Sequence, residues 1–308
     1  MGTRLKMMRI PICVAGTAFV LLTAVAAVSQ TAGSNSAAPP SAAELRVQAD
    51  RIVANQHQND QALDLYERME RTEERKSAGD SSPSSVQVLR IFPVGTGNGR
   101  VSLGEDGKPA DAAAYLRELR KIESALAWAS QDGHSQRDAY ARFARRRKDR
   151  ADLLEAAREA FTVTWLGRES RNGRTLAKIR LDPSPSYKPT SRLTGMLPKV
   201  RALVWFDEAT AHLARFEGEI LGDITFGGGI VAKVYKGGHF VLEQAEVSPG
   251  VWLPVYYQYD FDGRKFFFGF GVHERISVTG YRRVGPPQEA VQVVRTELNN
   301  LGGSHSNP

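Results

Sequence analysis

The sequence predicts an α+β fold in which helices accompany a curled antiparallel sheet. Two observations indicate the sheet: strand-like segments alternate with tight-turn signals after Phe161, and aromatic residues recur at every second position near residue 260. The helices are indicated by residues 109–161, which are rich in Ala, Arg, Leu and Glu. With 308 residues, 42% hydrophobic and 24% charged, the chain fits one or two globular domains, and collagen, wholesale disorder and a polytopic membrane protein are excluded.

The first 29 residues have the order of a secretory signal peptide. A basic stretch up to Arg9 precedes a nearly uncharged run over residues 10–28, and small-residue sites follow. A single membrane-spanning anchor is the alternative, since a run of this length just reaches across a bilayer. Both interpretations place the bulk of the chain outside the cytoplasm, and we expect a periplasmic protein. Residues 30–41, which are mostly small or polar, are expected to be a flexible linker.

Charge and cysteine content exclude several functions. The formal charge of +7 includes Arg4, Lys6 and Arg9 of the leader, and without them 38 basic residues stand against 34 acidic ones, or +4. A surplus this small does not indicate nucleic-acid binding. The only cysteine, Cys13, also lies in the leader. The mature chain is therefore expected to have no disulfide, no catalytic thiol and no cysteine-ligated zinc.

The first folded element is predicted to be a helix over residues 42–58. Ser41 and Glu44 have the spacing of a capping box, and apolar residues follow at helical spacing: Leu45, Ala49, Ile52 and Val53. Residues 61–76 have helix propensity, but propensity alone does not decide between helix and strand. Residues 86–94 are rich in Val, Ile and Phe and predict a strand. The glycines that follow lack the spacing of a phosphate-binding loop and indicate a turn.

Residues 109–161 predict a helical hairpin interrupted at Gln131-Asp132-Gly133-His134. Its second arm is strongly basic, with only two acidic residues, Asp138 and Asp149, among Arg137, Arg142, Arg145, Arg146, Arg147, Lys148 and Arg150. Such a run is either a solvated helix face or a patch for anionic lipid headgroups or phosphates. The second interpretation would bring the protein into peripheral contact with an anionic membrane surface.

Hairpins are predicted throughout the region after Phe161. Asn172-Gly173 is a strong turn signal, and a turn there would pair Leu166 with Ile179 and Thr164 with Leu181. Residues 200–206 and 211–221 predict the next two strands. Gly237-Gly238 would then join residues 230–236 to residues 239–247, with Tyr235 opposite Phe240.

The turn signal Asp262-Gly263 predicts the hairpin that matters most for function. A turn there makes Phe261 face Arg264 and sets Asp260 opposite Lys265. In this register one face is mostly polar and the other is apolar, with Leu253, Val255, Tyr257, Tyr259, Phe261, Phe266, Phe268, Phe270 and Val272. With a further strand at residues 276–284, about eight strands form a meander, which curls because long sheets twist.

A curled sheet with an aromatic concave face needs a cover, because exposed apolar surface costs roughly 25 cal/mol per Å² and promotes association. Either the helices of the protein fill the concavity as a permanent core, or an apolar ligand occupies it, or each does so in turn. The residues alone leave these alternatives open.

Several short motifs resemble the LolA/LolB-like outer-membrane lipoprotein-sorting family of bacterial envelope proteins over residues 42–284. They are Leu65-Tyr66-Glu67-Arg68, Gly107-Lys108-Pro109, Val204-Trp205-Phe206-Asp207, Phe226-Gly227-Gly228-Gly229, Val234-Tyr235-Lys236-Gly237-Gly238-His239-Phe240 and Gly250-Val251-Trp252-Leu253-Pro254. The resemblance implies an unclosed half-barrel with helices lining its hollow, a first strand at residues 61–76 that pairs with residues 86–94, and carriage or sensing of acyl chains. No functional residue of the family matches closely enough to be transferred.

The expected domain is therefore a LolA-like half-barrel over residues 42–285, with a helical insertion at 109–160 and a polar C-terminal tail over residues 286–308. We expect no catalytic residue, no cofactor and no metal site. The six histidines lack metal-ligand spacing, no Gly-x-Ser-x-Gly motif occurs, and the aspartates fall at turns or strand ends.

The resulting hypothesis is a non-enzymatic periplasmic protein that holds an acyl chain or a lipidated partner, such as a lipoprotein, in the concave face. The ligand-binding rings would be Tyr257, Tyr259, Phe261, Phe266, Phe268 and Phe270, with Trp205 and Trp252 near the rim. The alternative is an envelope sensor or scaffold of the same fold that binds a protein partner through its outer face without carrying lipid.

Overall fold

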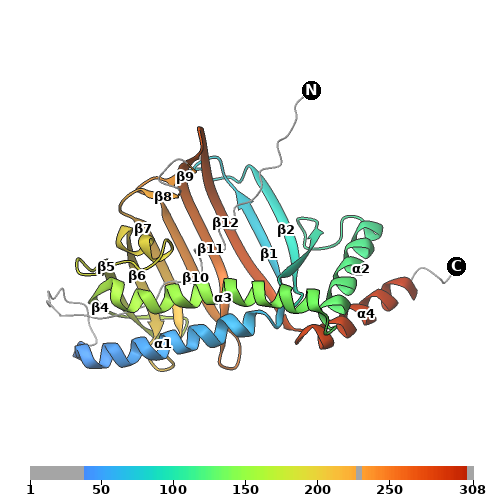
Figure 1. Cartoon of the computed structure of the whole chain (residues 1–308), viewed down its shortest axis with the longest axis horizontal. Coiled ribbons are helices and arrows are strands. Elements are labelled where there is room, and N and C mark those ends of the chain that lie inside the picture. The colour runs from blue at the N-terminus through green and yellow to red at the C-terminus, as the bar shows by residue number, and fades with distance from the viewer. Residues whose placement is uncertain (1–37, 227–230, 304–308) are drawn as a thin grey trace.

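The computed structural model describes residues 38–226 and 231–303, and its elements are labelled in Figure 1. The predicted signal peptide and residues 30–37 of the predicted linker lie outside the described residues. The helices are α1 (Ala42–Leu63), α2 (Ala112–Ala129), α3 (His134–Ala160) and α4 (Pro287–Gly303), with a 3₁₀ helix η2 (Thr194–Lys199). None of the described helices is long and apolar enough to span a membrane.

The described strands form one antiparallel sheet of 12 strands. The strands are β1 (Tyr66–Glu74), β2 (Ser85–Pro93), β3 (Asn98–Leu103), β4 (Phe161–Arg171), β5 (Arg174–Pro183), β6 (Val200–Asp207), β7 (Leu213–Ile220), β8 (Ile224–Phe226), β9 (Ala232–Val234), β10 (His239–Ser248), β11 (Val251–Lys265) and β12 (Phe268–Arg283). The order is β3-β2-β1-β12-β11-β10-β7-β6-β5-β4, and the small β8–β9 ribbon joins β11. Since β3 and β4 remain unpaired edges among these strands, the sheet is an unclosed half-barrel, and the predicted α+β fold is confirmed.

Local sequence signals account for the start of the fold. Ser41 and Glu44 form both hydrogen bonds of the predicted capping box, and α1 runs to Leu63. The chain then enters β1, which has β2 on one side and β12 on the other. Two hydrogen-bonded neighbours outweigh the helix propensity of this segment. The first strand implied by the family resemblance is therefore present.

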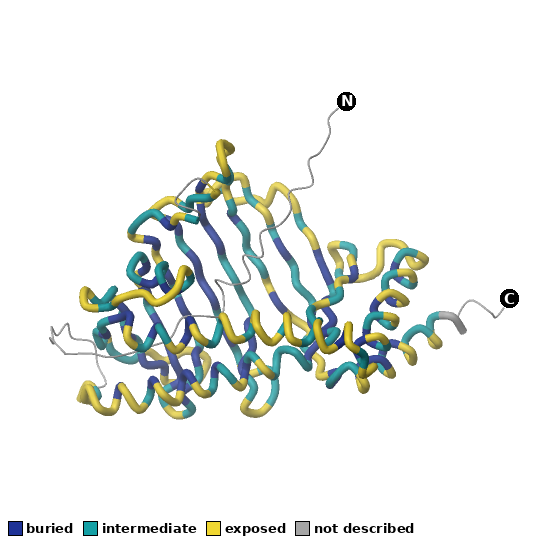
Figure 2. The backbone as a smooth tube through the Cα atoms, in the orientation of Figure 1, coloured by how far each residue is buried: buried dark blue, intermediate teal, exposed yellow. Residues whose placement is uncertain are grey.

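Two buried clusters lie on different parts of the sheet. We call the sheet face that packs on α1 and α3 the inner face, and the opposite face the outer face. The larger cluster joins α1 and the end of α3 to the inner side of β4–β7, β10 and β11 through residues such as Ile52, Leu153, Val204, Phe216 and Phe240. Figures 1 and 2 show α3 crossing this face and α2 and α4 lying at the β2 end.

The smaller cluster joins α2 and α4 to β2 and β3, with Phe92, Leu119, Leu126, Val291 and Val294 among its members. Residues 286–308 were expected to be a polar tail, but α4 occupies most of that segment and buries Ala290 and Val294. The apolar residues of α4 fall on one side of the helix and contact α2. The two helices of the predicted hairpin accordingly separate, with α2 on α4 and α3 extended across the sheet.

The Asn172-Gly173 turn is present, and both residues have positive φ, 52° and 74°. Its predicted register holds only near the turn. A bulge between Trp165 and Gly167 moves the pairing by one residue, so that Trp165 rather than Leu166 lies opposite Ile179. Leu166 is the residue that does not pair, and a bulge of this kind is not signalled by periodicity.

The predicted pairing of residues 230–236 with residues 239–247 was wrong. β9 pairs instead with β8 and with the end of β11, where Val234 lies opposite Gly263. Tyr235 is 39% exposed, whereas Phe240 is buried opposite Tyr259. The reason is that β10 already has two partners, β7 and β11, so no edge remains for β9.

The hairpin predicted at Asp262-Gly263 exists, but its turn lies at Phe266-Phe267. Phe261 is opposite Val272, and Asp260 faces His273 rather than Lys265. Gly263 lies within β11, where an added Cβ would come within 2.4 Å of the Lys233 carbonyl oxygen. This glycine therefore allows β9 to approach closely and makes no turn. Because both turns contain two residues, the strands keep their predicted faces.

Candidate functional site

An unbroken row of aromatic rings crosses the inner face on β7, β10 and β11. The ring centroids of Phe216 and Phe240 are 5.2 Å apart, and those of Phe240 and Phe261 are 6.2 Å apart. Tyr259 lies 6.0 Å from Phe261, and Tyr257 lies 6.0 Å from Tyr259. These separations are within the range of attractive ring contacts, so the row packs as one unit.

Two glycines make room for this row. A Cβ on Gly218 would lie 2.2 Å from the ring of Phe240, and one on Gly238 would lie 2.7 Å from the ring of Phe261. Phe240 therefore lies against the backbone of β7, and Phe261 against the backbone just before β10. A glycine within a strand pattern is the sequence signal for such a close approach. Gly218 offered this signal, but Phe216 and Phe240 were not among the predicted binding residues.

The row is buried at one end and half-buried at the other. Phe216, Phe240 and Phe261 belong to the core that α1 and α3 cover. Tyr257 is only partly buried, and Ile276 lies opposite it on β12. Val272, also partly buried against the same core, lies opposite Phe261, and Glu274 stands between Val272 and Ile276 on this face. Although the residue as a whole is partly exposed, desolvation of the Tyr257 hydroxyl raises its pKa well above the usual range. We call Tyr257, Val272 and Ile276 the inner apolar patch.

A charged border lies beside the inner apolar patch on β1. Arg68 Nη2 is 2.8 Å from Glu70 Oε1, and Arg68 is only 8% exposed. Thr72, the next residue on this face, is opposite Ile276. The inner face therefore combines apolar side chains on β11 and β12 with charged ones, which are Glu274 of β12 and the residues of β1. Such a mixture suits an amphipathic ligand better than a pure hydrocarbon.

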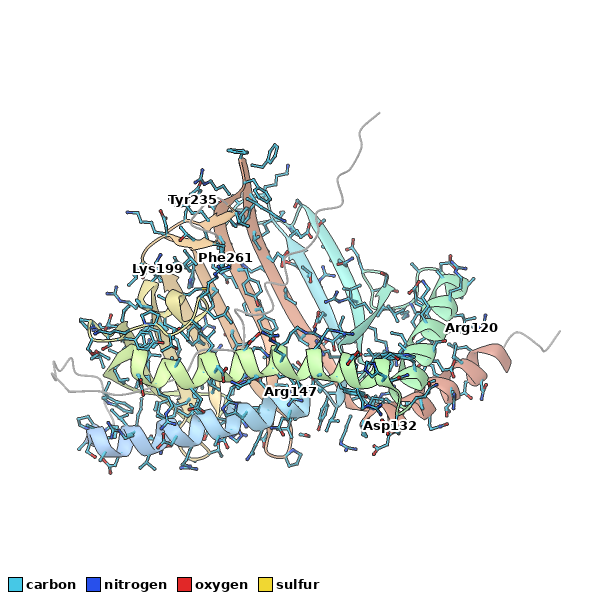
Figure 3. The ribbon with its side chains drawn as sticks, in the orientation of Figure 1. Arg120, Asp132, Arg147, Lys199, Tyr235 and Phe261 are labelled. Atoms are coloured by element: carbon cyan, nitrogen blue, oxygen red, sulfur yellow. The ribbon has the colours of Figure 1, made fainter. Side chains whose placement is uncertain are left out.

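Part of α3 crosses the sheet without packing on it. Between Arg137 and Asp152 no side chain of this helix is buried, and we call this part the α3 strap. Arg147 Nη1 pairs with Asp64 Oδ2 of the α1 end at 3.1 Å, and Arg146 donates a hydrogen bond to the Thr96 carbonyl. Figure 3 shows Arg147 on α3, with Phe261 farther along the sheet. Polar contacts, rather than apolar burial, hold the α3 strap in place.

A buried carboxyl lies next to the α3 strap. Desolvation raises the pKa of Asp60 from 3.8 to about 6, against the opposing effects of Arg150 and of a hydrogen bond from Gln56. The raised pKa means that the folded state holds its proton to higher pH than the unfolded chain does. Asp60 therefore lowers stability progressively as the pH rises from about 4 to about 6.

Replacing Asp60 with Asn should raise the free energy of unfolding at about pH 7 by about 1–3 kcal/mol, because the buried charge disappears while the hydrogen bond from Gln56 is kept. Urea unfolding at about pH 7 and about pH 4 measures this, and the gain should vanish at the lower value. Asp50→Asn, on the exposed side of the same helix, is the control and should change stability by less than about 1 kcal/mol. An equal gain at both pH values would contradict the prediction.

The structure brings together only some of the predicted binding residues. Tyr257, Tyr259, Phe261 and the partly buried Phe270 share the inner side of the β11–β12 pair. Phe266 and Phe268 are at the hairpin tip and exposed. Their predicted place on the inner wall depended on a turn at residues 262–263, and the later turn moves them to the end of the sheet.

The two predicted rim tryptophans lie elsewhere. Trp205 alternates with the core residues Val204 and Phe206, so its ring is on the outer face, 4.5 Å from Lys178 Nζ. Trp252 stacks on His212 with ring centroids 5.4 Å apart, under the guanidinium of Arg174. Both positions are accounted for by packing and by cation–π contacts.

Among residues 38–226 and 231–303, no group of three or more His, Cys, Asp or Glu side chains is arranged to hold a metal ion. His273 comes closest to a polar constellation, with Nδ1 3.3 Å from Asp260, and Arg275 pairs with the same carboxylate at 2.9 Å. These hydrogen bonds hold the pKa of Asp260 below its usual range although burial opposes its ionisation. The cluster is a cross-strand ion pair on the outer face.

No protein-family model matches the chain, and no curated protein matches it. Solved structures that are similar to it at low identity include the following three. A domain from Vibrio parahaemolyticus named as an outer membrane lipoprotein-sorting protein is 11% identical, with 80% of this chain and 99% of that chain covered and a TM-score of 0.30. A DUF1329 family protein from Desulfovibrio piger is 13% identical, covering 77% and 92%, with a TM-score of 0.29.

A LolA superfamily protein from Nitrosomonas europaea is 8% identical, covering 72% and 90% of the two chains, with a TM-score of 0.26. This chain resembles LolA-like proteins. Two of these three structures carry the name of the family that the sequence motifs resemble.

Proposed function

We propose that this chain is an exported, non-enzymatic binding protein that holds an acyl chain, or an acylated partner, on its inner face. The observation that carries the proposal is the inner apolar patch, whose half-buried Tyr257, Val272 and Ile276 continue the aromatic row out of the core. Apolar side chains that remain partly exposed beside a packed core offer a ligand additional contact area.

The cover of the inner face differs along the sheet, and this limits where a ligand fits. α1 and the end of α3 fill the face over β4–β7 and β10 as a permanent core. Beyond that core, the α3 strap contributes no buried side chain. An acyl chain would therefore lie between the aromatic row and the charged border, with its polar end toward Arg68 and Glu70.

Loading and release need no covalent chemistry. The α3 strap is held by the Asp64–Arg147 ion pair and a few hydrogen bonds, and exposed or half-exposed pairs of this kind contribute little, about 0–1 kcal/mol each. A displacement of the α3 strap would give a ligand access, and the energy of the bound state would come from apolar burial.

A fluorescent acyl chain tests the proposal. An anthroyloxy-labelled stearate should bind saturably to the purified protein, and Ile276→Gln or Val272→Gln should weaken its binding about ten-fold by placing an amide in the patch. Ser277→Gln is the matched control, because Ser277 is the next residue of β12 and is exposed on the outer face. Thermal unfolding of each variant shows that the fold is kept.

Absence of saturable binding to the wild-type protein would overturn the proposal. So would an equal loss in the Ser277→Gln control. The exported location rests on residues 1–29, and N-terminal sequencing of the protein recovered from the bacterial envelope checks whether that segment has been removed.

A further inference from the structure

Three consecutive phenylalanines are exposed at the tip of the β11–β12 hairpin. Phe266, Phe267 and Phe268 are 49%, 92% and 77% exposed. Figures 1 and 2 show this tip extending past the neighbouring strands, at the end of the sheet away from α1 and α3. Single exposed apolar residues are common on protein surfaces, but three adjacent aromatic rings on a projecting turn mark an interaction site. We call these residues the Phe tip.

The backbone of the Phe tip is strained. Phe266 has a φ of 54°, in the left-handed region that bulky residues avoid. The two-residue turn between β4 and β5 uses Asn172 and Gly173 for the same purpose, and those residues adopt positive φ readily. A phenylalanine at such a position costs stability, and about half of its surface remains exposed here. Strain of this kind is retained at functional sites, where the side chain is needed for another purpose.

Basic side chains surround the base of the Phe tip. Arg264 and Lys265 precede it on β11, opposite Lys233 and Ala232 of β9, and Lys236 lies in the turn that follows β9. The acidic residues nearby are Asp262 and Asp223, and the latter pairs with Lys233 at 2.6 Å. Four cations against two anions leave a net charge of +2 immediately behind the rings. Long basic side chains at this level place their charges beside lipid phosphates while their methylenes lie along apolar surface.

The arrangement of the Phe tip suits a bilayer better than a protein. Successive residues of a tight turn point in different directions, so a rigid partner surface covers only part of the tip, whereas hydrocarbon surrounds all of it. The backbone is also prepared for an apolar medium: β11 and β12 are paired up to Lys265 and Phe268, and the Phe266 amide donates to the Val231 carbonyl at 3.0 Å. Few polar backbone groups would lose their partners on insertion.

We propose that the Phe tip inserts into the boundary between headgroups and acyl chains of an anionic bilayer, with Lys233, Lys236 and Lys265 contacting the lipid phosphates. Aromatic rings and basic side chains are the pair of features that place peripheral proteins at this depth. The site is separate from the inner apolar patch, and it positions one end of the half-barrel against a membrane.

A probe on the tip tests insertion directly. In the full chain with Cys13→Ser, a nitrobenzoxadiazole dye is attached at Phe267→Cys or, as the control, at Val47→Cys, which replaces an exposed residue of α1. With vesicles of equal parts phosphatidylcholine and phosphatidylglycerol, the dye at position 267 should shift to shorter wavelength and gain intensity, and the dye at position 47 should not. Because each dye reports its own position, membrane binding through the leader cannot imitate the result.

Two sets of substitutions separate the rings from the charges. Phe266→Gly combined with Phe267→Asn should weaken binding to these vesicles at least about ten-fold while raising the thermal unfolding temperature, because the turn strain is relieved. Lys233→Gln combined with Lys265→Gln should weaken it about five-fold per charge removed, and only when phosphatidylglycerol is present. Phe267→Ser alone keeps the strained turn and should also weaken binding, which separates the ring from the strain.

The proposal is overturned if the dye at position 267 shows no spectral shift when vesicles are added. It would also be overturned if sedimentation showed a dimer that disappears with the Phe tip substitutions, since the rings would then bind a second copy of the chain. The Phe tip variants should still bind labelled stearate, and Ile276→Gln should still bind vesicles, so the failure of one proposal is distinguishable from the failure of the other.

Discussion

Arg90→Met should lower the free energy of unfolding by about 3–5 kcal/mol, because it removes the centre of a largely buried ion-pair network. Arg90 lies 2.9 Å from Glu67 and 2.6 Å from Glu297, and it also donates to the Tyr115 hydroxyl. The side chains of Arg90 and Glu67 are 14% and 8% exposed. Removing the guanidinium leaves Glu297 and Tyr115, which join α4 and α2 to the sheet, without their cation.

The effect of Arg90→Met should depend on pH. Although burial opposes ionisation of Glu297, the hydrogen bonds from Arg90 and Tyr115 hold its pKa below the ordinary 4.5. The stabilisation from this carboxylate is therefore present above that value and is lost as the pH falls through the lowered pKa. Urea unfolding at neutral and acidic pH measures the difference. Lys121→Met, which removes a surface pair with Glu118, is the control and should cost less than about 1 kcal/mol.

Phe240→Ala should destabilise the fold by about 3–5 kcal/mol, and the loss should be partly recovered by a second substitution. Phe240 is 5% exposed, stacks on Phe216 and covers Gly218. Gly218→Ala alone should also destabilise, because the new methyl group would meet the Phe240 ring at 2.2 Å. In the double variant the ring is absent and the methyl group occupies part of the space that it leaves.

A double-mutant cycle measures this coupling by chemical unfolding of the four proteins. The double variant should be more stable than the sum of the two single losses by about 1 kcal/mol or more. Additive losses would show that the ring does not lie over the glycine. Gly195→Ala, where an added Cβ meets nothing within 4 Å, is the control for replacing a glycine as such.

Local chemistry made much of this fold predictable. The capping box at Ser41 and Glu44 placed the start of α1, and Asn172-Gly173 placed a turn, because each pair satisfies specific backbone groups by itself. The identity of the sheet faces was also predictable, since side-chain alternation survives a shift in the position of a two-residue turn.

The features that escaped prediction depend on neighbours distant in the sequence. Asp262-Gly263 has the composition of a hairpin turn, yet Gly263 is held in β11 by the approach of β9 and by the ring of Phe270. α4 acquires its apolar role only in the presence of α2. For the candidate site, Tyr257, Tyr259 and Phe261 were predictable from alternation, whereas the charged border at Arg68 and Glu70 required knowing that β1 lies beside β12.

The pairing of β1 with β12 affects the order in which the fold can form. β1 is an interior strand of the sheet and pairs with β12, so that Tyr66 lies opposite Arg283 near the other end of the chain. Contacts between such distant segments form slowly, because the intervening loop must close first. A chain synthesised from its N-terminus therefore carries β1 with one hydrogen-bonding side unsatisfied until the last strand arrives. During that interval β1 can pair with strands of other chains. A chaperone that covers β1 would be most effective before residues 268–283 leave the ribosome.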